Sequence, residues 1–377
     1  MILSSLLFLL VACKSLAVPT EKQNSTAPAG ILQLPLFNVP GEPGTNETVD
    51  TAFNRRQVST GLDIFSGKTW GFLGTVVEIG TPPQRVILEP DTASRFLWVP
   101  MLPFGRQRAG SESVYFDSIS SSSLQDLGRT LTLKYSAESV IAEGHVEKVS
   151  IEGQAVGKMI VGLVDLRRPQ NKLGRIIGVL PLKPSSIGGN EVFLPKKLLN
   201  EGITRSTAFG LCAREQGRGA LTFGGYDTSK FSGPLEKLPM VPGLDHTSFF
   251  IQQVSFRTGA APGTVVIDRQ SNQGNPVDMG VDSGNPVLYL PTRLERDFAA
   301  KTGSTVQDTF LEIDCRVVDN GAAFDFHITN NLVVSIPLSD YVHERKNNGN
   351  TCQLAITFRK PPANCSVPPF SLLPRVV

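Results

Sequence analysis

From Trp70 onward the chain is a succession of short apolar runs, and this texture constrains the fold more than any single motif does. The runs are rich in Val, Ile, Leu, Phe and Thr, and Gly, Pro, Asn or Ser interrupts them about every eight to twelve residues. Such spacing is typical of a protein built from many short β-strands. Helical patterns are few, and the best cover Phe193 to Asn200 and Thr292 to Thr302. The sequence therefore predicts an all-β fold with few short helices.

Length and composition allow two lobes, each with its own core. The chain has 377 residues, of which 40% are hydrophobic and 19% charged, as is ordinary for a soluble globular protein. Its 36 Lys and Arg residues nearly balance 34 Asp and Glu residues, for a formal charge of +2. The sequence has no basic block that could follow a phosphate backbone, and no basic amphipathic helix that could bind a membrane surface. Neither nucleic acid nor membrane is an expected partner.

The N-terminus is typical of a protein that enters a secretory pathway. Residues 1–17 hold an apolar stretch followed by small residues, and we interpret them as a signal peptide. A bacterial lipid-attachment site at Cys13 is the alternative. We expect the protein to be secreted or to reside in an endomembrane, lysosome-like compartment. Three Asn-x-Ser/Thr sequons are predicted glycosylation sites, at Asn24, Asn46 and Asn364.

The next segment, residues 18–60, differs in composition from the strand-rich remainder of the chain. It is rich in Pro, Asn, Thr and Glu, contains one short apolar piece at Ile31–Phe37, and ends near the dibasic pair Arg55-Arg56. We interpret it as a pro-segment that a processing protease removes after Arg56. A disordered, glycosylated N-terminal tail is the alternative.

Two aspartate triplets lie between apolar runs, Asp91-Thr92-Ala93 early and Asp282-Ser283-Gly284 late. A carboxylate in such a place is costly to bury unless it is hydrogen-bonded or shared with another group. Two such sites indicate a pair contributed by duplicated halves. We therefore predict an N-terminal β lobe over 61–235 and a C-terminal β lobe over 236–377.

A pair of carboxylates suits the hydrolysis of peptide bonds by water. That reaction needs a base for the proton of water, and an acid for the carbonyl oxygen or the leaving amine. Two adjacent carboxylates cannot both ionise cheaply, so one keeps a proton while the other stays charged. The hypothesis is that Asp91 and Asp282 hold the attacking water and exchange these roles.

Four stretches then carry a resemblance to a known family: residues 74–84, 91–100, 219–233 and 281–284. In this order and spacing they resemble the pepsin-like aspartic proteases, the family of pepsin and cathepsin D. The resemblance implies a bilobal double β-barrel fold with a substrate cleft between the lobes, and a secreted aspartic endopeptidase. It also implies a polypeptide substrate, inhibition by pepstatin-like compounds, a monomer, and neither cofactor nor metal.

The resemblance assigns roles to further residues. Thr92 and Ser283 would tie the two catalytic loops together, and Ser94 would donate to the outer oxygen of Asp91. Asn285 stands where the family has Ser or Thr. Tyr135 lies where the family has a flap over the substrate, although a plain surface hairpin is the competing interpretation. The full set of supporting and flap residues is Thr92, Ser94, Ser283, Gly284, Asn285, Tyr135, Trp98, Ser136 and Ala137, with Ile176-Ile177-Gly178 packed beneath the first loop.

Five cysteines are present, and Cys13 would leave with the signal peptide. The others lack the paired spacing of a zinc site, and the four histidines are scattered singly. By resemblance, Cys315 and Cys352 form the disulfide of the second lobe. For Cys212 and Cys365 three states stay open: a bond to each other, free thiols, or links between chains.

Two departures from the family bear on activity. Ala93 replaces a glycine of the first loop, and we expect its methyl group to crowd the site and impair activity. Pro374 stands where a glycine belongs in the second lobe, and the sequence stops at Val377 before the family's final strands, which suggests a truncated product or a relative without catalytic demand. The alternatives to an active peptidase are therefore an impaired homologue that binds peptide or protein, and a structural β-protein with accidental triplets.

Overall fold

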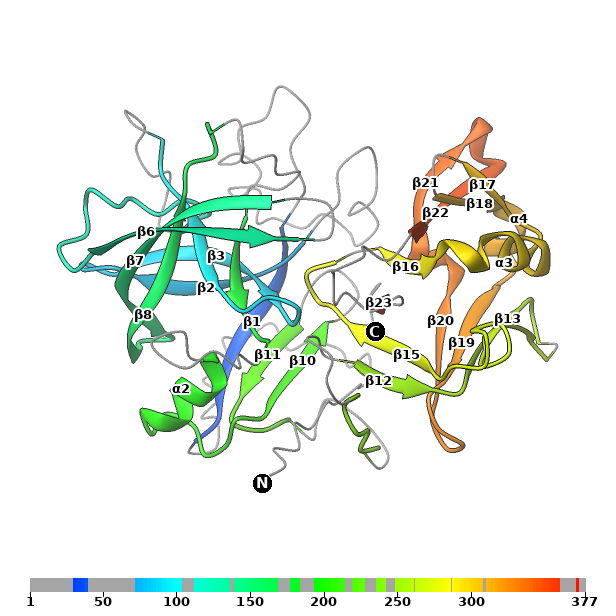
Figure 1. The fold of residues 1–377 in the computed structure, drawn as a ribbon, viewed down its shortest axis with the longest axis horizontal. Coiled ribbons are helices and arrows are strands. Elements are labelled where there is room, and N and C mark those ends of the chain that lie inside the picture. Colours follow the sequence, from blue (N-terminus) through cyan, green and yellow to red (C-terminus); the bar gives the residue numbers. More distant parts are fainter. Residues whose placement is uncertain are drawn as a thin grey trace, which may run out of the picture. The chain divides into compact units, whose positions relative to one another are not determined.

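The computed structural model divides the chain into two compact units whose main spans are Thr69–Gly233 and Pro234–Val376, here called the N-terminal and C-terminal lobes (Figure 1). Residues 30–39 belong to the N-terminal lobe. The signal peptide, the three sequons and the dibasic pair lie outside the described residues. Among the residues that the structure describes, no helix has the length and apolar character needed to cross a bilayer. The structure describes residues 30–39, 72–103, 112–135, 139–168, 177–183, 193–213, 219–227, 235–241, 248–260, 262–285, 287–307, 310–359 and 371–372.

The N-terminal lobe is a sheet of eleven strands with the order β10-β11-β1-β2-β3-β9-β4-β8-β7-β6, in which β5 pairs with β3. An additional pairing of β2 with β7 closes six of them, β2-β3-β9-β4-β8-β7, into a barrel (Figure 1). The predicted all-β fold is confirmed. The strands are β1 (Leu32–Val39), β2 (Phe72–Ile79), β3 (Gln84–Asp91), β4 (Leu97–Pro100), β5 (Glu112–Ser113), β6 (Gln125–Lys134), β7 (Ser139–Ile151), β8 (Gln154–Val164), β9 (Gly178–Pro181), β10 (Phe209–Ala213) and β11 (Gly219–Phe223).

The barrel core explains why these apolar runs form strands. Strand β7 alternates buried and less buried side chains along most of its length, the period of a strand with one face inward. Strands β4 and β9 are buried along their whole length, because neighbours cover them on both sides. One cluster of buried side chains gathers around Trp98, whose side chain has no exposed surface. The first aspartate triplet begins at the end of β3 and precedes β4.

Strand β1 comes from the segment for which the sequence predicts a pro-segment or tail. It pairs with β11 on one side and with β2 on the other, so it lies inside the sheet rather than at its edge. In Figure 1 it is the blue strand beside β11. Leu32, Leu34 and Leu36 are buried, and they alternate with more exposed residues. The short apolar piece thus forms a strand of the folded lobe.

The C-terminal lobe contains two sheets. The larger has eight strands in the order β12-β15-β23-β16-β22-β18-β17, with β21 paired to β22, and the smaller has the order β14-β13-β19-β20. Rings of Phe298, Phe324 and Tyr341 pack against one another in the core. The strands are β12 (Ser248–Ile251), β13 (Gln253–Arg257), β14 (Thr264–Asp268), β15 (Val277–Val281), β16 (Leu288–Pro291), β17 (Thr305–Gln307), β18 (Phe310–Asp314), β19 (Ala323–His327), β20 (Val333–Pro337), β21 (Val342–Lys346), β22 (Thr351–Arg359) and β23 (Ser371–Leu372).

Both predicted helical segments are helical. The first is α2 (Leu194–Asn200), which has a proline in its first turn, where no backbone N–H is needed. The second begins as a 3₁₀ turn at Thr292–Leu294 and continues as α3 (Glu295–Thr302), which ends at Gly303 in a left-handed conformation. A third helix, α4 (Cys315–Asp319), was not predicted from the sequence. Asp314 caps it by accepting a hydrogen bond from the backbone N–H of Arg316.

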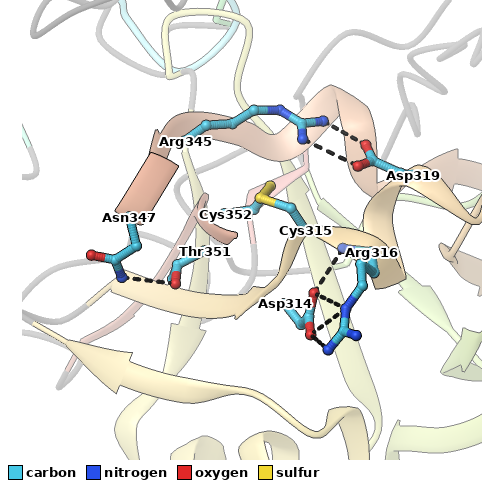
Figure 2. Close-up of a disulfide and its surroundings, with 8 residues drawn as sticks. All are labelled: Asp314, Cys315, Arg316, Asp319, Arg345, Asn347, Thr351 and Cys352. Atoms are coloured by element: carbon cyan, nitrogen blue, oxygen red, sulfur yellow. Dashed lines mark hydrogen bonds and ion pairs between the residues drawn. A yellow bond between two sulfur atoms is a disulfide. The ribbon is translucent and has the colours of Figure 1, made fainter. Parts of the chain in front are cut away.

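The disulfide predicted for the second lobe is present. Cys315 and Cys352 are bonded across a sequence separation of 37 residues, and both side chains are buried (Figure 2). The bond ties the start of α4 to strand β22. Cys212 is also disulfide-bonded, and its partner lies outside the described residues. The alternative in which Cys212 is a free thiol is therefore wrong.

Candidate active site

The first aspartate triplet forms a tight loop at the end of β3. Asp91 is the last residue of that strand and is only 3% exposed. Its Oδ1 accepts from the backbone N–H of Ala93 at 2.7 Å, and its Oδ2 accepts from the Ser94 hydroxyl at 2.5 Å. The predicted contact between Ser94 and Asp91 is thus present in the structure. Both carboxylate oxygens are held in place by donors from the next three residues.

Strand β9 supports this loop from the side. It runs parallel to β3, with Asp91 opposite Pro181, and the backbone N–H of Leu182 donates to the carbonyl oxygen of Asp91 at 2.9 Å. Lys183 N–H donates in the same way to the carbonyl oxygen of Ser94 at 3.0 Å. Sequence reasoning missed Leu182 and Lys183. The signal for them was the apolar run, which continues through Pro181, just beyond the predicted segment Ile176-Ile177-Gly178.

Gly178 starts β9 and permits the close approach of β4. A Cβ atom at this position would lie 2.3 Å from the carbonyl oxygen of Trp98 and 2.9 Å from a methyl group of Leu88. Any side chain there would push apart the strands before and after the Asp91 loop. Ile177 is buried in a cluster with Ile87 of β3. Ile177 and Gly178 therefore lie beside the strand that leads to Asp91, whereas Ile176 is outside the described residues.

Trp98 and Tyr135 are brought together as predicted. The indole Nε1–H of Trp98 donates to the hydroxyl of Tyr135 at 2.6 Å. Tyr135 follows β6, in the connection to β7, and its partly buried ring packs against the core cluster that contains Trp98. This hydrogen bond attaches the connection between β6 and β7 to β4, the strand that follows the Asp91 loop. Ser136 and Ala137, at the tip, are outside the described residues.

The second triplet forms a comparable loop after β15. Gly284 N–H donates to Oδ1 of Asp282 at 3.0 Å. The Asn285 side chain donates to the carbonyl oxygen of Val287 at 2.9 Å and accepts from its N–H at 3.2 Å. Asn285 thus braces its own loop through Val287. Asp282 and Ser283 are partly buried.

The two loops share one construction, although each lies in its own lobe. In both, the N–H two residues after the aspartate donates to Oδ1, and the N–H three residues after donates to the aspartate carbonyl, at 3.3 Å in the first and 3.4 Å in the second. In both, a short strand runs parallel to the strand before the loop and antiparallel to the strand after it. This strand is β9 in the first lobe and β23 in the second. Ser371 and Leu372 thus lie beside β15, the strand that precedes Asp282.

Ala93 fits into the first loop without backbone strain. It has no positive φ, and neither has Gly284 at the matching position, so neither place requires the left-handed conformation that favours glycine. Its N–H makes the same bond as that of Gly284, and the residue is partly exposed. The backbone donor on which the loop depends is therefore retained. The expected loss of activity from crowding stays a prediction.

Comparison with known proteins relates both loops to a single family pattern. The profile described as eukaryotic aspartyl protease matches residues 72–367, a span that includes both aspartate triplets and Tyr135. An acid protease of Saccharomycopsis fibuligera is 24% identical over 374 residues, covering 93% of this chain and 90% of that protein. Secreted aspartic protease 1 of Candida albicans is 25% identical over 324 residues, covering 81% of this chain and 74% of that protein.

A third relative is more similar over a shorter stretch. The probable aspartic-type endopeptidase OPSB of Arthroderma benhamiae is 30% identical over 255 residues, covering 62% of this chain. The matched stretch amounts to 48% of that protein, so the chain spans about half the length of this relative and nearly all of the first one.

Proposed function

Because this chain belongs to the eukaryotic aspartyl protease family and is, as a member, an aspartic endopeptidase, we propose that Asp91 and Asp282 form its catalytic pair. Its substrates are polypeptides, as the family implies. In the proposed reaction the ionised carboxylate takes a proton from water while the protonated one donates to the carbonyl oxygen of the scissile bond. The first carboxylate then gives that proton to the leaving amine, while the second takes a proton from a hydroxyl of the tetrahedral diol as the C–N bond breaks, which restores the starting state.

The observation that carries this proposal is the common construction of the two loops. A backbone N–H fixes Oδ1 of Asp91 at 2.7 Å and Oδ1 of Asp282 at 3.0 Å, from equivalent positions in each loop. Accepting such a bond fixes the orientation of a carboxylate. A general base must be held still to be efficient, because small displacements of a reacting group lower the rate steeply. Thr92 and Ser283, which follow the two aspartates, would tie the loops together.

Substrate closure is assigned to the hairpin between β6 and β7. Tyr135 is fixed at one end of it by the hydrogen bond from Trp98 and by packing on the adjacent core. We propose that this hairpin is the flap that orders the substrate, with Ser136 and Ala137 at its tip. A hairpin that joins two long strands is suited to such closure.

Secretion belongs to the same proposal. Residues 1–17 have the composition of a signal peptide, and three sequons occur in the chain. One relative is named a secreted protease. We propose that the protein enters a secretory pathway and acts as a monomer outside the cell or in an acidic endomembrane compartment, with glycans on Asn24, Asn46 and Asn364.

The test is hydrolysis of a denatured protein substrate at about pH 4, where coupled carboxylates titrate. We expect Asp91→Asn and Asp282→Asn each to lower kcat by about 100-fold or more, with a smaller change in KM. A pepstatin-type inhibitor should abolish hydrolysis by the wild-type protein. Asp297→Asn is the matched control, because it makes the same chemical change on the exposed face of α3.

Two results would contradict the proposal. The first is an Asp282→Asn variant that hydrolyses the substrate as fast as the wild type. The second is a wild-type protein that binds the pepstatin-type inhibitor or denatured polypeptide tightly without turnover. That second result supports the impaired, peptide-binding homologue instead.

A further inference from the structure

The hydrogen bond from Trp98 to Tyr135 spans two strands of the N-terminal sheet. Trp98 lies on β4 and Tyr135 follows β6, and β8 and β7 stand between β4 and β6 in the order of the sheet. Strands β6, β7 and β8 are labelled side by side in Figure 1. The bond nevertheless measures only 2.6 Å between the indole nitrogen and the phenol oxygen. The two side chains therefore reach each other across β8 and β7, so the residues of these strands limit how closely they approach.

Gly162 of β8 is the direct neighbour of Trp98, because the two are paired in the parallel register of β4 and β8. A Cβ atom on Gly162 would lie 3.2 Å from the Cβ of Trp98 and 2.9 Å from the Cβ of Ala142 on β7. Ordinary contacts between carbon atoms are about 3.5–4.0 Å. Gly162 has no positive φ, so glycine is needed here for space and not for its backbone conformation.

Ala142 fills the room that Gly162 leaves. Its side chain is fully buried, and it belongs to the core cluster that contains Trp98 and against which Tyr135 packs. Ala142 and Gly162 together thus place a single methyl group between β7 and β4. A second methyl would meet the first side-chain carbons of two residues, which cannot rotate away because they are attached to the backbone. Since a packed interior responds to even one methylene, the strands themselves would have to separate.

We propose that Gly162 and Ala142 are positioning residues for the β6–β7 hairpin. The one methyl group that they share sets the spacing of β4 and β7 at which the indole of Trp98 reaches the hydroxyl of Tyr135. Neither residue touches the reacting atoms, so both act through Trp98. This inference rests on the proposed function of the hairpin as the flap over the substrate. A second methyl lengthens the 2.6 Å bond, and an increase of about 1 Å takes it beyond hydrogen-bond distance.

The first measurement follows the indole N–H of Trp98 by NMR, in the full-length protein with ¹⁵N-labelled tryptophan. The chain has two tryptophans, and Trp70→Phe assigns their signals. Tyr135→Phe removes the acceptor and gives the signal of an indole without this bond. We expect Gly162→Ala to move the Trp98 signal to the position that it has in Tyr135→Phe. A residue with a merely structural role would lower stability and leave this native-state signal in place.

Two matched variants separate this role from a general effect of added volume. Gly210→Ala makes the same change in β10 of the same lobe, where the new Cβ would lie 3.8 Å from the nearest atom outside its chain neighbours. It should leave the Trp98 signal and the activity unchanged. The swap Ala142→Gly/Gly162→Ala keeps one methyl group between the strands and removes the contact of 2.9 Å. Because volume-conserving exchanges are tolerated best, the swap should return the signal to its wild-type position.

Peptidase kinetics give the second measurement. Gly162→Ala should lower kcat/KM for a polypeptide substrate about tenfold, chiefly through a higher KM, because the flap loses its attachment while Asp91 keeps its own donors. Tyr135→Phe should show the same pattern. The swap should recover kcat/KM to within about threefold of the wild-type value. If Gly162→Ala does not fold, the swap decides alone: the wild-type indole signal supports the proposal, and the signal of Tyr135→Phe contradicts it.

Two results overturn the inference. One is an indole signal of Trp98 that is the same in Gly162→Ala as in the wild type. The other is a swap variant whose signal matches that of Tyr135→Phe. Both are taken from the spectrum and need no peptidase activity. A wild-type protein without activity that shows the expected spectra contradicts the catalytic proposal and supports the spacing role of Gly162 and Ala142, so the two failures are distinguishable.

Discussion

The disulfide between Cys315 and Cys352 should be the largest single local contribution to the stability of the C-terminal lobe. The perturbation is the double variant Cys315→Ala/Cys352→Ala. The bond spans 37 residues. Closing a loop of that size removes about 13 cal/mol/K of chain entropy from the unfolded state, equivalent to about 4 kcal/mol at 25 °C. The exposed bidentate pair of Arg345 and Asp319 nearby, shown in Figure 2, is screened by solvent and contributes far less.

Arg345→Ala is therefore the matched control, because it removes an interaction in the same neighbourhood without opening the loop. Tryptophan fluorescence is unsuitable, since the two tryptophans, Trp70 and Trp98, precede the C-terminal lobe. Hydrogen exchange of peptides from β18 and β22 reports on this lobe directly. We expect exchange through global opening to be roughly a thousandfold faster in the double cysteine variant and at most about fivefold faster in Arg345→Ala.

A change of less than about tenfold in the double cysteine variant would refute this reasoning. It would mean that the unfolded lobe is already compact enough for the bond to constrain little. An equal effect of Arg345→Ala would refute the ranking of the two interactions.

Three further predictions concern buried polar groups. Glu147 is fully buried and accepts from Ser121 Oγ at 2.6 Å, so Glu147→Gln should cost about 1–3 kcal/mol in urea unfolding, and an unchanged midpoint contradicts this. Tyr341 buries a hydroxyl that has no hydrogen-bond partner among the described residues, so Tyr341→Phe should raise lobe stability by about 1 kcal/mol, measured by calorimetry, and destabilisation would show that the hydroxyl is satisfied. Burial lowers the pKa of His343, whose ring stacks on Phe310, below its ordinary value of 6.5. The unfolded chain then binds more protons, so stability falls as pH drops below 6.5. In urea unfolding at several pH values, His343→Gln should flatten that fall, and identical slopes in both proteins would exclude it.

The sequence predicted best the features in which local chemistry and tertiary structure agree. The bond from Ser94 to Asp91 was implied by the family resemblance, and it is a local one, because its donor lies three residues from its acceptor. The bond from Trp98 to Tyr135 joins residues 37 positions apart, and only the family resemblance predicted it. The support from Leu182 was missed, since its donor is a backbone group, and only the apolar run that continues through Pro181 pointed to this part of the chain.

Strand β1 lies within residues 18–60, whose composition is rich in Pro, Asn, Thr and Glu and which stay predicted as a pro-segment or tail. Composition alone did not indicate a strand there. The useful signal was the period of two in Leu32, Leu34 and Leu36, the pattern of a half-buried strand. Helix α4 was missed for a different reason: its five residues are too few for helical periodicity.

Closure of the six-stranded barrel has a consequence for how the N-terminal lobe folds. The β2–β7 pairing that closes the barrel, here called the seam, joins Glu78 to Ser150, residues that are 72 positions apart (150 − 78 = 72). The β2–β3 and β7–β8 hairpins involve near neighbours in sequence and can form early, whereas the seam must wait until most of the intervening chain is ordered. We expect refolding on the millisecond-to-second scale that non-local strand pairing imposes. During synthesis, the Glu78–Ile79 end of β2 would keep one edge open until the ribosome has released β7.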